Sequence, residues 1–273
     1  MKAWYIGAAA GVVLLAGSAV AGLDTSKLKS VPAHGDDHPL QEIISGYEFR
    51  TPETQSLQDD DFSNPAFPWV DRGEEAWSTV DGAAGKSCQS CHGDADESMK
   101  GVRANMPKWN EEKGRPLTLE QNINNCRTER MQADAWKWES DDMLGMTAFI
   151  GTKSRGMPMH VQISGPMKPW FEKGKSIYYQ RFGQLDMACA HCHEDNYGNY
   201  IRADMLSQGQ INGFPTYRLK WQKPGSIHRR FKGCIGSIRG DGFKRGSDEL
   251  VALEVYVAHR GQGLPIETPA VRQ

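Results

Sequence analysis

Two stretches of the chain carry apolar side chains at helical spacing. They are DDMLGMTAFIG, residues 141–151, and DELVALEVYVAH, residues 248–259. In both stretches apolar residues recur three and four positions apart, which is the period of an α-helix. The pattern therefore predicts one apolar helix near the middle of the chain and a second one near its end.

The chain opens on a different pattern, MKAWYIGAAAGVVLLAGSAVAG, in which one lysine precedes an apolar run and the small residues Ala19-Val20-Ala21. This order is typical of a secretory signal peptide, cleaved here after Ala21. A retained membrane anchor is the alternative, but the apolar core is shorter than the ~20 residues that a span needs. We therefore expect residues 1–21 to be a signal peptide and the mature protein to be periplasmic, without a membrane span.

Composition and charge narrow the class of protein. The chain has 273 residues, of which 38% are hydrophobic and 24% charged, which is enough for one or two buried cores. Its formal net charge is −2, and loss of Lys2 with the signal peptide makes it one unit more negative. A nucleic-acid-binding protein carries a basic footprint, so this balance argues against a nucleic-acid partner.

Four of the six cysteines lie in two short motifs, CQSCH (residues 88–92) and CAHCH (residues 189–193). Both match C-x-x-C-H, the attachment site of c-type haem. Two thiols at this spacing add to the two haem vinyl groups, and the histidine that follows is placed to bind iron. We therefore expect two covalently attached haem c groups, one on Cys88 and Cys91 and the other on Cys189 and Cys192.

The sequence around the motifs repeats. A glycine lies 15 residues before the first cysteine of each motif, and an aromatic residue follows four positions later: Gly73 with Trp77, and Gly174 with Tyr178. In a small cytochrome c domain, a glycine and an aromatic residue at this place mark where the N-terminal helix crosses the C-terminal helix. We therefore expect a helix before each motif to cross one of the two apolar helices.

Each half of the chain thus has the order helix, haem motif, loop, further cysteine and closing helix. The predicted fold is mainly α, with two tandem cytochrome c domains: residues 66–155 with haem 1 and residues 166–273 with haem 2. They are joined near SRGMPMHVQISGPMKPW, whose glycines and prolines interrupt regular structure. Residues 22–65 are rich in Asp, Pro, Ser and Thr, and we expect them to form an irregular N-terminal extension.

One further cysteine follows each motif, Cys126 in the first half and Cys234 in the second. Because they occupy corresponding places, each is a candidate axial ligand to the iron of its own half. Methionine holds this position in many cytochromes c and raises the potential, so other ligands stay open. The rivals are Met157, Met159, His160, His191, His228 and His259.

The second of these cysteines lies in a basic segment, RRFKGCIGSIR. We expect its four cationic residues to lower the thiol pKa of Cys234 and to attract a small anion; they are Arg229, Arg230, Lys232 and Arg239. Two alternatives remain. Cys126 and Cys234 could form a disulfide in an oxidising compartment, and the basic segment could be a solvated surface or a docking patch for haem propionates.

The chain resembles the SoxA family, the dihaem subunits of the SoxAX cytochromes of periplasmic thiosulfate oxidation. The resemblance rests on the segments ISGYEF, QDDDFSNPAFPWVDRGEEAW, GKSCQSCHGD, NINNCR, CAHCHEDNYG, GFPTYRLKW and RRFKGCIGSIR. It covers most of the mature chain and includes the extension before the first haem motif. A dihaem cytochrome c peroxidase would share only the two C-x-x-C-H motifs.

The resemblance implies an L-cysteine S-thiosulfotransferase that couples thiosulfate oxidatively to a cysteine of the SoxYZ carrier. Two electrons then leave through a SoxX-like monohaem partner subunit to a c-type cytochrome acceptor. It also implies axial ligand pairs, His92 with Cys126 and His193 with Cys234. Cys234 would be the catalytic sulfur, modified to a persulfide, and Arg230 would bind the anionic substrate.

Two other classes of function remain open at this point. A plain dihaem electron carrier needs neither a reactive cysteine nor an arginine pocket, so replacing Cys234 by methionine would change only the potential. A peroxidase would have a five-coordinate haem after reduction. Thiolate ligation of both irons lowers the potential and makes oxygen or peroxide chemistry less suited to this chain.

Overall fold

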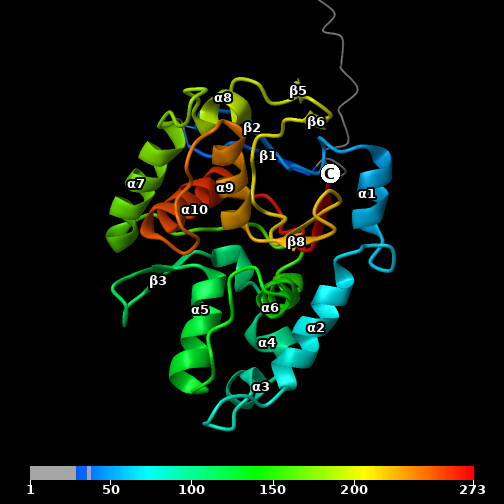
Figure 1. Ribbon diagram of the computed structural model, residues 1–273, viewed down its shortest axis with the longest axis vertical. Coiled ribbons are helices and arrows are strands. Elements are labelled where there is room, and N and C mark those ends of the chain that lie inside the picture. Colours follow the sequence, from blue (N-terminus) through cyan, green and yellow to red (C-terminus); the bar gives the residue numbers. More distant parts are fainter. Residues whose placement is uncertain (1–28, 36–37) are drawn as a thin grey trace, which may run out of the picture.

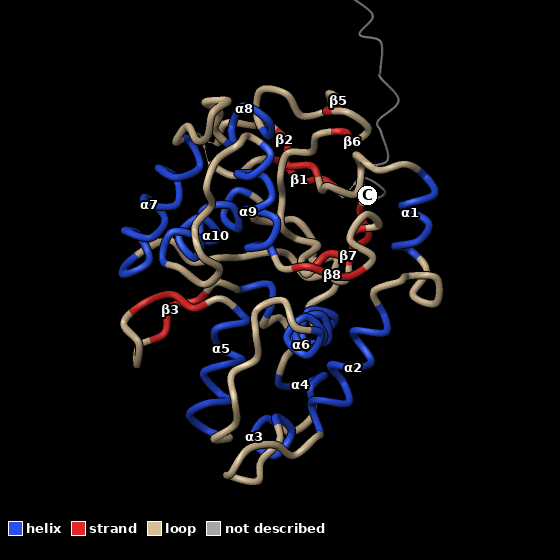
Figure 2. Tube along the Cα trace, viewed as in Figure 1, coloured by secondary structure: helices blue, strands red, loops and turns tan. Residues whose placement is uncertain are grey.

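The computed structural model describes residues 29–35 and 38–273, so the predicted signal peptide lies outside the described residues. Figure 1 shows two helical halves stacked along the long axis of the molecule, the first cyan to green and the second yellow to red. Figure 2 shows that helices and loops dominate and that the strands are short. Within the described part, the model has no helix with the length and apolar character of a membrane span.

The first half contains residues 67–152. Its helices are α2 (Phe67–Ser78), α3 (Cys88–His92), α4 (Ala95–Ser98), η1 (Arg103–Asn105), α5 (Leu119–Asn125), the π-helical turn η2 (Cys126–Arg130) and α6 (Asp141–Thr152). Strands β3 (Lys108–Asn110) and β4 (Arg115–Leu117) form an antiparallel hairpin. The helix expected over residues 141–151 is present as α6, and its side chains from Met143 to Gly151 are buried.

The second half repeats this order. Its helices are η3 (Gly165–Met167), α7 (Lys168–Tyr179), α8 (Cys189–His193), α9 (Ile227–Ser237) and α10 (Asp248–Arg260). Its strands are β5 (Tyr200–Ile201), β6 (Asp204–Met205), β7 (Thr216–Arg218), β8 (Lys223–Gly225) and β9 (Ala270–Arg272). The predicted helix over residues 248–259 is present as α10, which is buried along almost its whole length.

The two predicted helix crossings are both present. α2 packs on α6, and α7 packs on α10. A Cβ atom on Gly73 would lie 2.3 Å from the carbonyl oxygen of Gly145, and one on Gly174 would lie 1.9 Å from that of Ala252. Neither distance is compatible with a side chain, so a residue without Cβ is required for the backbones to approach this closely.

A further repeated feature is the helix that carries each additional cysteine. Each follows a two-stranded hairpin and begins at a hydroxyl residue whose side chain accepts a backbone N–H, Thr118 for α5 and Ser226 for α9. Such caps satisfy donors that the first helical turn leaves unpaired. Cys126 lies eight residues after Thr118, and Cys234 lies eight residues after Ser226. The two cysteines therefore occupy the same position in the repeat.

The segment before the first half, residues 29–65, is named here the N-terminal arm. It is more regular than expected, because β1 (Ser30–Pro32) pairs with β2 (Glu42–Ile44) and is followed by α1 (Pro52–Asp59). The arm precedes the first half in sequence but lies against the second (Figure 1). Ser45 Oγ donates to Glu267 Oε1 at 2.7 Å, and Asn64 Nδ2 donates to the carbonyl oxygen of Pro269 at 2.9 Å. Its polar residues thus bind the C-terminal segment, and this order replaces the irregular structure predicted from composition.

The C-terminal segment also holds the connection between the halves. β9 lies parallel to β7, and the N–H groups of Gly156 and Met159 donate to the carbonyl oxygens of Ile266 and Leu264 at 2.9 and 2.8 Å. The glycine- and proline-rich connection is therefore fixed by backbone hydrogen bonds to the end of the chain.

Candidate haem and thiolate sites

Each C-x-x-C-H motif forms a short helix of its own, α3 in the first half and α8 in the second. The first is capped by Ser87, whose Oγ accepts the N–H of Ser90 at 3.1 Å. In the second, His191 Nδ1 accepts the N–H of Ala188 at 3.0 Å. This histidine therefore caps the helix and is not a free ligand for iron. The motif cysteines are free thiols, and this donor set fits covalent attachment of haem c at both places.

The proximal histidine of the second motif is held in a defined orientation. His193 Nδ1 donates to the carbonyl oxygen of Ser207 at 2.7 Å. Gly209 packs against the ring, since a Cβ atom there would lie 2.9 Å from His193 Cγ. A histidine that binds a metal usually has its second ring nitrogen occupied in this way. With Nδ1 occupied, Nε2 is the nitrogen of His193 that faces Cys234 and the one that could bind iron.

Cys234 lies beside this histidine, on α9. Burial alone would raise the pKa of its thiol, but Arg230, the His193 ring and Arg218 outweigh burial and lower the pKa to about 6, from an ordinary value of 9.0. The thiolate is therefore the favoured form at neutral pH, and a thiolate is the form that binds metal and attacks sulfur.

Two arginines lie near Cys234 and a third lies next to them, and the three come from separate elements. Arg230 is on α9, Arg218 is on β7, and Arg50 comes from the N-terminal arm. Burial and the neighbouring guanidinium groups lower the pKa values of Arg50 and Arg218 to about 10. Asp204 is the nearby acid, with Oδ2 3.6 Å from a terminal nitrogen of Arg218. Three crowded cations with one carboxylate form a site suited to a small anion.

Three of the four cations that the sequence placed near Cys234 have other partners. The guanidinium of Arg229 stacks on Trp221, 4.1 Å from the ring centroid. Lys232 Nζ donates to the carbonyl oxygen of Phe243 at 3.0 Å, and Arg239 reaches Gln184 Oε1 at 3.5 Å. The expectation of a four-residue cationic segment was therefore too broad. On a helix, adjacent residues point in different directions, and of the four only Arg230, one turn before Cys234, is among the main influences on its thiol.

Cys126 occupies the corresponding place in the first half but has different neighbours. It lies close to the motif cysteines Cys88 and Cys91. Burial raises the pKa of its thiol, Arg130 opposes this increase, and the net effect is upward. His92 closes the motif helix and lies beside Trp77, with ring centroids 5.8 Å apart. The residues expected as the axial pair of haem 1 are thus in the same half, without the cationic pocket of the second half.

The structure also shows where the residues of the disulfide alternative and of the rival iron ligands lie. Cys126 and Cys234 are both free thiols, each beside the haem motif of its own half, so the disulfide alternative has no support. His228 is buried, stacked on Trp138 and 3.1 Å from a carboxylate oxygen of Glu254. Met159 is buried in the core of the second half, and Met157 packs at its edge.

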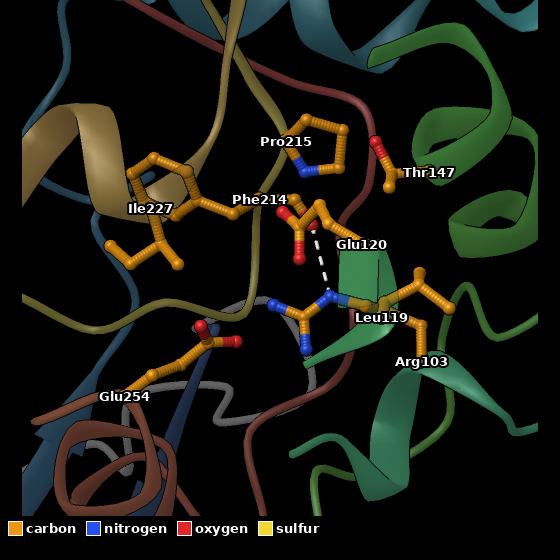
Figure 3. A pocket seen from close by; sticks show the side chains of 8 residues that line it. All are labelled: Arg103, Leu119, Glu120, Thr147, Phe214, Pro215, Ile227 and Glu254. Atoms are coloured by element: carbon orange, nitrogen blue, oxygen red, sulfur yellow. Dashed lines mark hydrogen bonds between the residues drawn. The ribbon is translucent and has the colours of Figure 1, made fainter. Parts of the chain in front are cut away.

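A small pocket lies between the two halves and does not include these thiols. Figure 3 shows Arg103, Glu120 and Thr147 of the first half facing Phe214, Ile227 and Glu254 of the second. Arg103 Nε donates to the carbonyl oxygen of Phe214 at 3.2 Å. Burial, followed by Glu254, raises the pKa of Glu120. The free volume is about 10 Å³, which is room for one water at most, so this is a polar junction rather than a substrate site.

Comparisons with known proteins agree with this geometry. The family model described as "SoxA/TsdA, cytochrome c domain" matches residues 72–159. The chain is 49% identical over 252 residues to the L-cysteine S-thiosulfotransferase subunit SoxA of Pseudaminobacter salicylatoxidans, covering 92% of this chain and 88% of that protein. It is 52% identical over 241 residues to the subunit of the same name from Rhodovulum sulfidophilum, covering 88% and 84%.

A solved structure is similar over nearly the whole chain. The crystal structure of SoxXA from P. pantotrophus superimposes with a TM-score of 0.87 at 48% sequence identity, covering 90% of this chain and 93% of that one. A cytochrome c domain carries covalently bound haem c, which the C-x-x-C-H motifs predict independently. With this identity, coverage and fold, the chain belongs to the SoxA family of L-cysteine S-thiosulfotransferase subunits.

Proposed function

We propose that this chain is the dihaem SoxA subunit of a periplasmic L-cysteine S-thiosulfotransferase. Its two halves would act as tandem cytochrome c domains, each with one haem c, and the second would contain the active site at Cys234. The observation that carries the proposal is a thiol whose pKa is lowered to about 6 with Arg230 and Arg218 close to it, and with a third arginine, Arg50, next to these two. An electron carrier has no need for such a site.

The arginines would bind and orient the substrate. Thiosulfate is a dianion, and Arg230, Arg218 and Arg50 together offer three positive charges with donors in fixed planar arrangements. Asp204 would keep the pocket from attracting larger polyanions, since it places a negative charge beside Arg218. The bound anion would thereby be brought next to the sulfur of Cys234, within a partly buried site where charge interactions are stronger than in water.

The reaction is an oxidative coupling of two sulfur atoms. A thiolate of the carrier protein and the outer sulfur of thiosulfate form one sulfur–sulfur bond, and the product is an S-thiosulfonate on the carrier cysteine. The carrier thiolate and thiosulfate together have three negative charges and the product has one, so two electrons leave. Cys234 is placed to relay the sulfur, as a thiolate or as a persulfide.

The haem groups would supply the electron exit. The residues that would hold them are Cys88 and Cys91 with His92 and Cys126 in the first half, and Cys189 and Cys192 with His193 and Cys234 in the second. When bound, haem iron accepts electrons one at a time. The protein's own part is to fix His193 through Ser207 and to keep Cys234 deprotonated through Arg230.

Several partners follow from this reaction. A SoxX-like monohaem subunit would form a heterodimer with this chain and pass the electrons to a c-type cytochrome acceptor. A SoxYZ-like protein would present the carrier cysteine at Cys234. These partners are proposed from the family, and isolation of the chain alone as an active enzyme would contradict the heterodimer.

The proposal is tested by comparing two adjacent arginines. Arg230→Ala removes a cation beside Cys234, so we expect kcat/KM for thiosulfate to fall by about 10²-fold while the haem spectrum stays nearly unchanged. Arg229→Ala is the matched control, because this side chain stacks on Trp221 instead, and it should retain most activity. Equal turnover in the two variants, measured with thiosulfate, carrier thiol and cytochrome c as acceptor, would remove the assigned role of Arg230.

A further inference from the structure

A group of histidines lies away from both haem motifs, where the N-terminal arm meets α10. His34 Nε2 is 3.4 Å from His259 Nε2, and the two rings meet edge to face, at 88° and with centroids 4.7 Å apart. The proposed reaction uses neither residue. They come from segments separated by 225 positions in sequence, so their approach is a property of the folded chain.

The distance between the two nitrogens distinguishes between two interactions. An N–H donor and a nitrogen acceptor are normally about 2.7–3.2 Å apart, so 3.4 Å is long for a hydrogen bond. Two nitrogens bound to one tetrahedral zinc ion, each about 2.0–2.1 Å from the metal, lie about 3.3–3.4 Å from each other. The observed separation is at the long end for a hydrogen bond and equals that of two ligands of one tetrahedral ion.

The second nitrogen of the His259 ring agrees with this interpretation. His259 Nδ1 lies 3.2 Å from Gln262 Oε1 and can donate its proton there, which leaves a lone pair on Nε2 facing His34. His34 Nδ1 is buried and has no hydrogen-bond partner. A side-chain oxygen behind a ligating imidazole is the usual support for a metal ligand.

Neighbouring histidines have separate roles. His38 is saturated, with Nδ1 3.1 Å from the backbone of Leu40 and Nε2 3.1 Å from the carbonyl oxygen of Arg260. His160, on the connection between the halves, is exposed and close enough to influence the pKa of His259. In residues 29–35 and 38–273 no three His, Cys, Asp or Glu side chains already converge as a complete metal site. Two ligands are in place, and His160 and water would supply the others.

We propose that His34 and His259 bind a divalent cation that prefers imidazole ligands, such as Zn²⁺, and that this ion fastens the N-terminal arm to α10. The site is separate from the haem irons and from Cys234. Binding of the ion would fix the position of the N-terminal arm, and the same arm carries Arg50 to the arginine pocket. This inference stands independently of the proposed thiosulfate chemistry.

The test uses the mature haem-loaded protein, dialysed against chelator and titrated calorimetrically with ZnCl₂. We expect one equivalent to bind, and binding to weaken by more than ~100-fold in the double variant His34→Ala/His259→Ala, since loss of supporting residues alone costs about 10–100-fold. His38→Gln is the matched control from the same arm and should keep the site. X-ray absorption at the zinc edge of the wild-type complex, which does not depend on any variant, should show at least two imidazole nitrogens.

Two results would overturn the proposal. One is a wild-type isotherm identical to that of the double variant, which would mean that zinc binds only adventitiously. The other is a zinc spectrum without imidazole ligands. A second expected result concerns the arm itself: zinc should slow proteolytic cleavage of residues 29–50 in the wild type but not in the double variant.

Discussion

The two halves of the molecule share one order of structural elements, but their additional cysteines have opposite electrostatic surroundings. Cys126 and Cys234 each lie eight residues after a capping hydroxyl residue and beside their own haem motif. The pKa of the Cys126 thiol is raised, chiefly by burial. That of Cys234 is lowered to about 6 despite burial, because Arg230, His193 and Arg218 lie close to it.

The difference in charge around the two cysteines arises from segments outside the shared order of elements. The N-terminal arm packs on the second half and contributes Arg50, and β7 contributes Arg218. The position in the first half that corresponds to Arg230 is occupied by Asn122; the cation that acts on Cys126 is Arg130, four residues after it, and Glu129 opposes it. A repeated fold thus supplies two equivalent cysteines, and neighbouring charge makes one of them suited to bind an anion and react with it.

The largest expected effect separates the two cysteines. Cys234→Ser should reduce thiosulfate-dependent turnover to background, because removal of a reacting sulfur eliminates the step that depends on it. Cys126→Ser should retain turnover, since that thiol lacks the cationic pocket. The measurement is steady-state reduction of cytochrome c with thiosulfate and carrier thiol. Equal loss in the two variants would mean that both halves are needed for chemistry.

Haem content must be followed in the same preparations. Each variant should keep both covalent haems, because the attachment cysteines are unchanged, and intact mass verifies this. Peptide mapping of the Cys234 segment without reductant adds a second observation. An additional sulfur of about 32 Da on this cysteine would favour the persulfide form, whereas an unmodified thiol would favour direct relay by the thiolate.

The helix crossings provide a comparison of stability between the halves. Gly73→Ala and Gly174→Ala would place a methyl group 2.3 and 1.9 Å from a carbonyl oxygen. Overpacking of this kind typically costs about 1–3 kcal/mol, and we expect the larger loss for Gly174. Chemical denaturation of the haem-loaded variants tests this. Wild-type stability in Gly174→Ala would show that α7 and α10 can separate without penalty.

Local patterns predicted much of this architecture. α6 and α10 can be recognised as long apolar stretches because both helices are buried nearly all round, and the glycines at the crossings can be recognised because only glycine fits there. The haem motifs can be recognised in the sequence because covalent attachment of haem c requires a fixed spacing of two cysteines and a histidine. Docking of the N-terminal arm on the second half was not predictable, since it depends on hydrogen bonds from Ser45 and Asn64 to residues more than 200 positions away.

The same limit applies to the candidate site. Cys234 was found because it occupies the same place as Cys126 in the repeat, and Arg230 because it lies in the basic segment and matches the family resemblance. Arg50 and Arg218 were missed, although both lie in or beside segments that carry the family resemblance, because nothing in their local sequence marks them as neighbours of Cys234. Charge counted along the chain also included Arg229, Lys232 and Arg239, whose side chains turn elsewhere. Sequence proximity is a poor measure of distance between charges.

Arg50 tests whether the arm is part of the active site. Arg50→Ala removes one of three cations, at a greater distance than Arg230, so we expect KM for thiosulfate to rise by about 10-fold with little change in kcat. The matched control in the arm is Lys29→Ala, because Lys29 binds Asp59 and lies over the Tyr47 ring. An unchanged KM in Arg50→Ala would restrict the substrate site to α9 and β7.

The smallest expected effect concerns pH and compares the arginine that lies near each cysteine. The pKa of the free Cys234 thiol is held at about 6, so the thiolate that can bind iron or attack sulfur predominates above this pH and is lost as pH falls through it. Arg230→Ala removes a cation that lowers this pKa, and the acid limb of its residual turnover should therefore move to higher pH, by less than about one unit at a partly exposed site. Arg130→Ala removes the corresponding influence on Cys126 and should leave the profile unchanged. A shift in both variants would mean that the first half takes part in turnover, whereas a shift in neither would mean that Arg230 acts on the substrate alone and not through the sulfur of Cys234.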